Sequence, residues 1–245
     1  MAHRISLITG AASGLGRATA LAMARRGDRL VLCDLTADGL DETVALVRDL
    51  GGDALWVVLD VTRPGAMEAA IDATRTLGGL DYAVNSAGIE GARAAAADYA
   101  WEDWRRVMAV NLDGVFLSMK AQIPALMDQG GGAIVNVGST ASFGGVETMP
   151  AYTASKHALL GLTRAAALDY APFNIRINAI CPGSFRTPMS ERLFGPDMTA
   201  MAEATPMKRL GSLEEIAAAI LFLCSDAASF ITGAALPVEG GKRAR

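Results

Sequence analysis

Histidine and cysteine are scarce in this chain of 245 residues, which has two of the former and three of the latter. The histidines, His3 and His157, stand far apart, and two isolated imidazoles do not make a plausible metal site. Cys33, Cys181 and Cys224 are also widely separated and lack the spacing of a metal-binding motif. We therefore expect no metal in the chemistry of this protein, and reduced thiols of the kind found in the cytoplasm.

Long hydrophobic runs and clusters of positive charge are missing as well. No apolar run approaches the roughly 18 residues of a membrane span, and the N-terminus continues directly into an expected strand, without a signal peptide. The net charge is −4, and basic residues cluster only in the tail 241–245, which we expect to be a solvated terminus. These features predict a cytoplasmic protein that binds neither a membrane nor nucleic acid.

What the chain has instead is a regular alternation of short apolar runs and helical patterns. Hydrophobic residues make up 51% of the sequence and charged residues 20%, which is typical of a globular domain. The expected strands are 4–9, 29–33, 54–59, 80–84, 133–137, 174–180 and 234–238. The alternation predicts a single α/β domain, residues 1–245, with a doubly wound parallel sheet of about seven strands and helices on both faces.

A glycine-rich turn follows the first expected strand and opens a helix. Such glycines let the backbone approach a pyrophosphate, and the helix N-terminus adds N–H groups and a positive dipole end. The second strand ends in Asp34, whose carboxylate can bind both ribose hydroxyls of NAD and would repel the 2′-phosphate of NADP. Ser13 and Leu35 are not basic, so the sequence favours NAD over NADP. The residues predicted to bind the cofactor here are Gly10, Ser13, Gly14, Leu15, Gly16, Asp34 and Leu35.

Simpler alternatives exist for this region, namely a tight turn for the glycines and a helix cap for Asp34.

Small and polar residues also follow the third and fourth expected strands. The carboxyl ends of parallel strands share one edge of a sheet, where ligands bind, and small residues there permit close approach of the backbone. The further residues predicted to contact the cofactor are Asp60, Val61, Asn85, Ala87 and Gly88.

Residues 139–156 bring together the side chains that can perform acid–base chemistry. Ser139 follows the fifth expected strand, and Tyr152 and Lys156 are four residues apart on the next helix, so they share one face. A hydroxyl, a phenol and an ammonium that converge there can move a proton to or from an alcohol oxygen. Ser142 is a rival for Ser139 in the same loop, and Tyr–Lys pairs at this spacing occur by chance in many helices.

Two further segments are expected to reach this site. A long helix is expected over 101–127, with Asn111 in its interior, where an asparagine is usually a surface residue or a satisfied buried amide. Beside Gly114 it can instead sit at a local kink with its amide aimed at the site. Residues 184–210 mix Pro, Gly, Met and charged residues, which is too irregular for a core segment and suits a mobile lid.

In this order, the motifs resemble those of the short-chain dehydrogenase/reductase family in its common single-domain form. The matching segments are Thr9–Gly16, Asn85–Gly88, Asn111, Ser139, Tyr152–Lys156, Pro182–Gly183, Thr187 and Ile231–Gly233. They extend over nearly all of the chain. Ser86 and Glu239 depart from the Asn and Asp that are usual in the family, at positions that do not carry the chemistry.

The resemblance implies that Asn111, Ser139, Tyr152 and Lys156 are the catalytic residues. Tyr152 would be the general acid/base and Ser139 would hold the substrate oxygen. Lys156 would bind the nicotinamide ribose and lower the pKa of Tyr152 through its positive charge. Asn111 would position a water that carries protons away by way of Lys156. The residues implied at the nicotinamide end of the cofactor are Pro182, Gly183, Phe185 and Thr187.

These features predict an oxidoreductase that transfers a hydride between NAD(H) and a secondary alcohol or ketone. One alternative is an NADPH-dependent 3-oxoacyl-thioester reductase, which shares these motifs but conflicts with Asp34. The other is a non-catalytic dinucleotide-binding sensor, which would have no reason to keep a complete proton-transfer set. The resemblance also implies a homotetramer, assembled through the helices at 101–127 and 150–171 and through the last strand.

The predicted substrate pocket is largely apolar. Its expected lining residues are Glu90, Ala141, Phe143, Val146, Glu147, Met149, Ser184, Phe185 and Met189. Two carboxylates among apolar side chains favour a neutral alcohol, cyclic or polyhydroxylated, with a carboxylate binding a hydroxyl group. An anionic substrate would need Arg93, Arg186 or Lys208 to turn inward.

Overall fold

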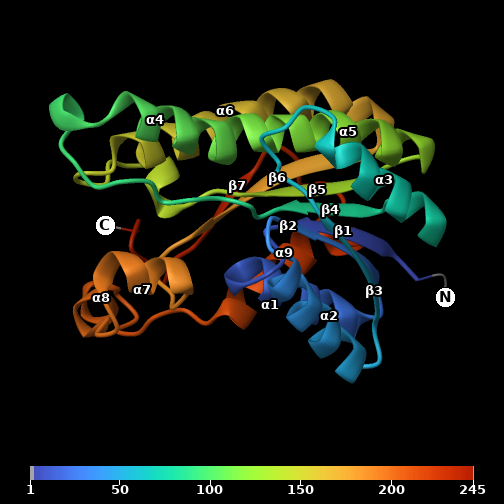
Figure 1. Cartoon of the computed structure of the whole chain (residues 1–245), viewed down its shortest axis with the longest axis horizontal. Helices are drawn as coiled ribbons and strands as arrows, with labels where there is room; N and C mark the ends of the chain where they lie inside the picture. Colours follow the sequence, from blue (N-terminus) through green and yellow to red (C-terminus); the bar gives the residue numbers. More distant parts are fainter. Residues whose placement is uncertain (1–2, 245) are drawn as a thin grey trace.

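The computed structural model describes residues 3–244 and contains one sheet of seven parallel strands (Figure 1). The strands are β1 (Ile5–Thr9), β2 (Arg29–Asp34), β3 (Asp53–Val58), β4 (Tyr82–Asn85), β5 (Gly132–Val137), β6 (Ile175–Pro182) and β7 (Ala235–Val238). Their order is β3-β2-β1-β4-β5-β6-β7, so the direction of winding reverses between β1 and β4. The predicted doubly wound α/β fold is confirmed, and ligands bind such sheets beyond the carboxyl ends of the strands at this reversal.

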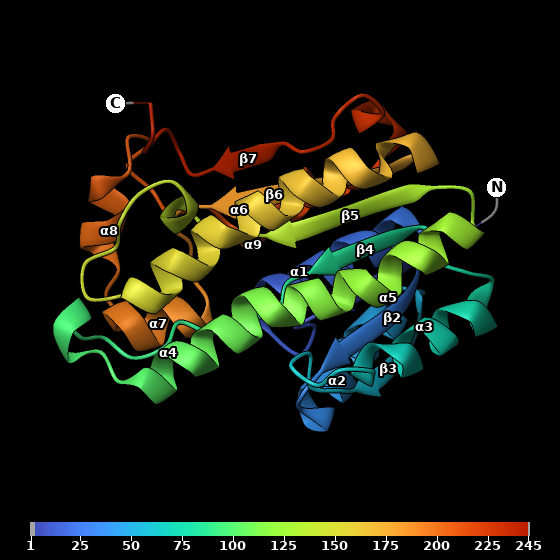
Figure 2. The ribbon, with the colours of Figure 1, turned by 90° about the horizontal axis from the view of Figure 1, so that it is seen from above.

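Helices cover both faces of the sheet (Figures 1 and 2). One face carries α1 (Gly14–Arg26), α2 (Ala37–Asp49) and α9 (Leu213–Cys224), and the other carries α3 (Ala66–Leu77), α4 (Trp101–Met108), α5 (Gly114–Asp128) and α6 (Pro150–Tyr170). Ile8 belongs to the hydrophobic core of the first face and Leu7 to that of the second. Because strand residues alternate between faces and both faces are covered, the central strands are rich in apolar residues.

Local sequence explains where several helices begin and end. Pro150 is the first residue of α6, where its fixed φ suits the helix. α9 begins with a capping box, in which Ser212 and Glu215 each accept a hydrogen bond from the other's backbone N–H. α1 ends at Gly27, whose φ of 94° is readily adopted only by glycine.

Two sequence expectations need correction. Residues 184–210 are not irregular throughout, because they contain α7 (Pro188–Phe194) and α8 (Thr199–Ala204). The basic tail is not simply solvated, because the Arg243 guanidinium lies 3.5 Å from the centroid of the Phe143 ring, in the loop after β5. Over residues 3–244, no helix combines the length and the apolarity needed to cross a membrane.

Candidate active site

The turn between β1 and α1 requires glycine at two positions. Gly10 has a φ of 69°, and a Cβ on it would lie 2.7 Å from the backbone nitrogen of Ala87. A Cβ on Gly16 would lie 2.0 Å from the carbonyl oxygen of Gly10, so the first turn of α1 packs directly on this loop. The helix N-terminus therefore faces bare backbone at the reversal of the sheet, which suits the binding of a pyrophosphate.

Residues 184–210, the predicted lid, approach this turn at Thr187. A Cβ on Gly14 would come 3.9 Å from Cγ2 of Thr187, which is the N-cap of α7 and accepts a hydrogen bond from the Ser190 N–H at 3.0 Å. The structure thus brings together Thr187 and the glycine turn. Ser13 is exposed at the N-cap of α1, whereas Leu15 and Phe185 pack in or against the hydrophobic core.

Asp34 is fixed by backbone groups at the end of β2. Its Oδ2 accepts a hydrogen bond from the Ala12 N–H at 3.0 Å, and its Oδ1 accepts one from the Leu35 N–H at 2.7 Å. The bond to Ala12 aims the carboxylate toward the glycine turn. The N-cap of α2 is Thr36, so a capping role does not explain Asp34. The side chain of Leu35 is exposed, as is that of Ser13.

The other predicted cofactor contacts lie at the same edge of the sheet. The Thr62 hydroxyl and N–H both donate to Asp60, at 2.7 and 2.9 Å, and hold the pKa of Asp60 below its usual range. Val61 follows directly and is partly buried. Asn85 is buried with its amide bound to Gln122 and Asn136, so its side chain serves the core, and the backbone after β4 is what can reach a ligand. At the end of β6, the Gly183 N–H, which follows Pro182, is bonded to Val238 in β7.

A π-helical turn, Ala109–Asp113, joins α4 to α5 and accounts for the position of Asn111. Such turns widen a helix locally and are frequent at functional sites. Asn111 is buried, accepts a hydrogen bond from the Ile89 N–H at 2.8 Å, and donates to the Ile89 carbonyl at 2.9 Å and to the Ser155 hydroxyl at 3.2 Å. Asn111 therefore links the loop after β4 to α6. A Cβ on Gly88 would lie 3.3 Å from Oδ1 of Asn111 and 3.7 Å from Nζ of Lys156, so the three residues meet.

The two serines after β5 have different surroundings. Ser142 is buried, and its Oγ accepts a hydrogen bond from the Ser139 N–H at 3.2 Å. Ser139 is partly buried, accepts from the Ala141 N–H at 3.1 Å, and forms a hydrogen bond with Tyr152. Of the two hydroxyls, that of Ser139 therefore faces the phenol.

Tyr152 and Lys156 lie on the same face of α6, with Nζ of Lys156 5.7 Å from the centroid of the Tyr152 ring. Nζ also donates a hydrogen bond to the Val137 carbonyl at 2.8 Å. Burial raises the pKa of Tyr152, the hydrogen bond with Ser139 opposes this rise, and the negative charge of Glu90 adds to it. In the protein alone, the pKa of Tyr152 therefore lies above its ordinary value because of burial, and the lowering of this pKa by Lys156 stays a prediction. Burial also lowers the pKa of Lys156, to about 8.

Sequence reasoning missed Arg192, which pairs with the predicted lining residue Glu90. Arg192 of α7 donates from Nε and Nη2 to the two carboxylate oxygens of Glu90, at 2.9 and 3.3 Å. Arg93 donates to the carbonyl of Leu193 at 3.3 Å, so the loop after β4 holds the lid at two points. Glu90 was among the expected lining residues, but a single arginine in a short helix carries no sequence signal of its own. The only indirect signal was the carboxylate of Glu90, because a charge expected in a largely apolar pocket needs a partner of opposite charge.

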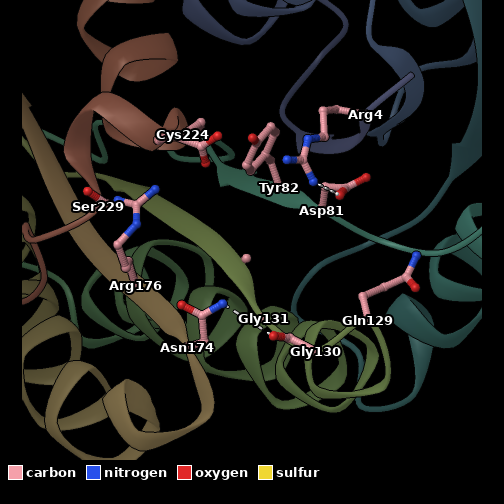
Figure 3. Close-up of a pocket in the computed structure, with 12 residues that line it drawn as sticks. Arg4, Asp81, Tyr82, Gln129, Gly130, Gly131, Asn174, Arg176, Cys224 and Ser229 are labelled. Carbon is pink, nitrogen blue, oxygen red and sulfur yellow. Dashed lines mark hydrogen bonds and ion pairs between the residues drawn. The ribbon is translucent and has the colours of Figure 1, made fainter. Parts of the chain in front are cut away.

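The cavity in Figure 3 lies at the opposite edge of the sheet, beside the N-terminal ends of the strands. It has a volume of about 200 Å³, and Arg4, Tyr82 and Arg176 are among its lining residues. The Arg176 guanidinium donates to the carbonyls of Leu223 and Ser225, at 2.7 and 3.1 Å, and thereby closes the C-terminal end of α9. None of the predicted site residues lines this cavity, so it is separate from the predicted catalytic side chains.

Comparison with known proteins extends over the whole chain. A family model described as "Enoyl-(Acyl carrier protein) reductase" matches residues 10–243. Cyclohexanol dehydrogenase of Acinetobacter sp. (strain SE19) is 41% identical over 239 residues, which cover 97% of this chain and 94% of the relative. The crystal structure of levodione reductase, at 37% identity, superimposes with a TM-score of 0.94 and covers 98% of each chain.

Solved relatives have been crystallised with either dinucleotide. NAD⁺-bound xylitol dehydrogenase is 38% identical, with a TM-score of 0.93 and coverage of 97% of this chain and 98% of that one. A protein described as a 2-deoxy-D-gluconate 3-dehydrogenase from Agrobacterium tumefaciens has bound NADP, at 38% identity and a TM-score of 0.90, with coverage of 99% and 97%. Both dinucleotides therefore occur on this fold, and the choice between them depends on individual side chains.

Proposed function

The chain belongs to the short-chain dehydrogenase/reductase family, and we propose that it is an NAD-dependent dehydrogenase of cyclic secondary alcohols. It is an oxidoreductase that acts on a secondary alcohol or the corresponding ketone. The observation that carries the proposal is the meeting of Asn111, Ser139, Tyr152 and Lys156 at the carboxyl edge of the sheet, beside the glycine turn. A ring-shaped substrate is supported by the similarity to cyclohexanol dehydrogenase.

The residues at the reversal of the sheet fit a dinucleotide. Bare backbone at Gly10 and the N-terminus of α1 suit the pyrophosphate, and a fixed carboxylate at Asp34 suits the two ribose hydroxyls. A 2′-phosphate would meet the Asp34 charge, and the nearby Arg17 is already bound to Glu42 at 2.8 Å. These features support NAD rather than NADP as the cofactor.

The catalytic side chains provide the proton transfers. In the oxidation, Tyr152 as phenolate accepts the proton of the substrate hydroxyl, and the Ser139 hydroxyl donates a hydrogen bond to the same oxygen. When bound, the nicotinamide supplies the hydride acceptor. Lys156 in its charged form stabilises the phenolate, and Asn111 fixes the spacing between α6 and the loop after β4. Reduction of the ketone is the reverse, with Tyr152 as the acid.

A homotetramer in the cytoplasm is the assembly and location we propose. Large apolar side chains are exposed on two separate regions, Trp101, Phe116 and Leu168 on the α4–α6 face and Phe222 and Phe230 near α9. Two self-complementary patches generate a closed assembly of four copies. Analytical ultracentrifugation should give four times the 25.4 kDa of the chain, and a monomer would refute this assignment.

The decisive experiment measures nicotinamide absorbance with cyclohexanol and either NAD or NADP. We expect turnover with NAD, and a loss of about 10²–10⁴-fold in kcat in Tyr152→Phe, since that is the usual contribution of a general acid–base. Binding of NADH by the variant, followed by fluorescence, shows that the fold and the cofactor site remain intact. Turnover with NADP alone would overturn the cofactor assignment and favour the 3-oxoacyl-thioester reductase. NADH binding without turnover of any alcohol would favour the sensor.

A further inference from the structure

Glu90 occupies a rigid position in the loop after β4. The residue before it, Ile89, is bonded through both its N–H and its carbonyl to Asn111. The residue after it, Gly91, has a φ of 78°, and a Cβ on it would lie 2.4 Å from Cγ2 of Val107. The backbone on both sides of Glu90 is therefore fixed against the segment that contains the π-helical turn.

The Glu90 carboxylate points away from open solvent and is covered by the lid. Its side chain is 16% exposed, whereas that of Arg192 is 60% exposed. The two parallel hydrogen bonds from Arg192 form the bidentate arrangement that fixes a carboxylate in one orientation. Arg192 thus neutralises the charge of Glu90 from the more exposed side of the pair.

The charge of Glu90 is felt at the catalytic phenol, where it adds to the effect of burial in raising the pKa of Tyr152. Glu90 is therefore close to the general base, and its neighbour Ile89 is bonded to Asn111. A carboxylate has about four lone-pair sites, and Arg192 occupies two of them. Glu90 can accept a further hydrogen bond from a hydroxyl group without giving up its ion pair.

We propose that Glu90, held by Arg192, is a specificity-determining residue that accepts a hydrogen bond from a second hydroxyl group on the substrate ring. The inference rests on the proposed function and narrows its substrates to cyclic diols. A ring that carries a carboxylate is rejected, because it could bind Arg192 only by displacing Glu90, which would leave two carboxylates close together. The ion pair selects neutral, hydroxylated rings over anionic ones.

The test compares kcat/KM with NAD for cyclohexanol, the cyclohexanediols and hydroxycyclohexanecarboxylate, in the wild type and in Glu90→Gln. We expect the wild type to prefer a diol to cyclohexanol. In the variant this preference falls about tenfold, because a hydrogen bond to a charged group is roughly twice as strong as a neutral one. Turnover of the carboxylate rises relative to cyclohexanol, since Arg192 is freed from its partner.

Glu191→Gln is the matched control. Glu191 is next to Arg192 on α7 but pairs with Arg186, at 2.7 Å, on the exposed side of the lid. Its replacement should leave the order of substrates unchanged. An unchanged diol preference in Glu90→Gln, or an equal change in Glu191→Gln, would refute the inference while turnover of cyclohexanol still supported the proposed function. Failure of the wild type with every cyclic alcohol would instead refute the proposed function itself.

The pH dependence separates a role at the site from mere support of the lid. Glu90→Gln removes a charge that raises the pKa of Tyr152, so the rise of kcat/KM with pH for oxidation should move to lower pH. Arg192→Gln leaves Glu90 without its neutralising partner, so the same rise should move to higher pH. Shifts of opposite sign support the assignment. Shifts of the same sign, or none, would indicate that the pair only holds the lid.

Discussion

Replacement of Lys156 by methionine should make the protein without cofactor more stable while it abolishes catalysis. Lys156 is only 5% exposed, and burial lowers its pKa from 10.5 to about 8. Between these two pH values the unfolded chain binds more protons than the folded one, so the stability from this residue rises with pH through that window. At about 1.4 kcal/mol for each pH unit, an ammonium at pH 7 costs the fold about 3 kcal/mol.

Lys156→Met removes that cost and also the hydrogen bond from Nζ to the Val137 carbonyl, which is worth about 1 kcal/mol. The variant should therefore be more stable by about 1–2 kcal/mol at pH 7, and its melting temperature should rise by about 2–8 °C. Above pH 10.5 only the lost hydrogen bond remains, so the difference should reverse in sign.

Thermal unfolding at fixed protein concentration, at pH 7 and at pH 10.5, measures both values. Lys120→Met, on the exposed side of α5, is the control and should show no change between the two pH values. A Lys156→Met variant that is destabilised equally at both pH values would refute the reasoning, since the ammonium would then not be penalised by burial.

Three other changes test the cofactor site and the assembly. Gly16→Ala places a Cβ 2.0 Å from the Gly10 carbonyl oxygen and should lower the melting temperature by at least about 6 °C. In Gly14→Ala the nearest atom is 3.9 Å from the Cβ, but the φ of 53° is strained for alanine, so the melting temperature should fall by about 2–6 °C. Calorimetry without cofactor compares the two variants. Asp34→Asn keeps an acceptor for the Ala12 N–H but loses the charge, so the ratio of kcat/KM for NAD over NADP should fall by about tenfold or more in steady-state assays. Phe230→Glu, at a fully exposed position, should reduce the oligomer to dimers in size-exclusion chromatography.

The fold could be predicted because its signals are local and repeated. The central strands are buried on both faces, so they stand out as apolar runs such as Ile5–Thr9. The glycine turn was predictable for a steric reason, since any Cβ on Gly16 would collide with the chain. The grouping of Ser139, Tyr152 and Lys156 followed from strand ends and helix spacing. This grouping depends on the helical period and on the positions where strands end, and both can be recognised in a sequence.

Ion pairs between distant parts of the chain could not be predicted in the same way. Arg192 and Glu90 are about a hundred residues apart, and neither belongs to a periodic pattern. The helices α7 and α8 were missed because each is shorter than two helical turns, and α7 is bounded by Pro188 and Gly195. The rise in the Tyr152 pKa through burial could not be predicted, because the sequence gives the neighbours of a phenol but not the depth at which it lies.

The residues that break local rules nevertheless identify the site. Asn111 is an amide inside a helix, and it is accommodated by a π-helical turn that widens the helix. Lys156 is an ammonium in the core, and Glu90 is a carboxylate covered by a lid. All three lie at one edge of the sheet, and Asn111 and Glu90 are held there by hydrogen bonds and an ion pair. At the opposite edge, the partly buried charge of Arg176 is satisfied by the carbonyls that end α9 and has a structural explanation. Within residues 3–244, the gathering of a buried ammonium, a buried amide and a covered carboxylate at the first edge supports the proposal that this edge carries the chemistry.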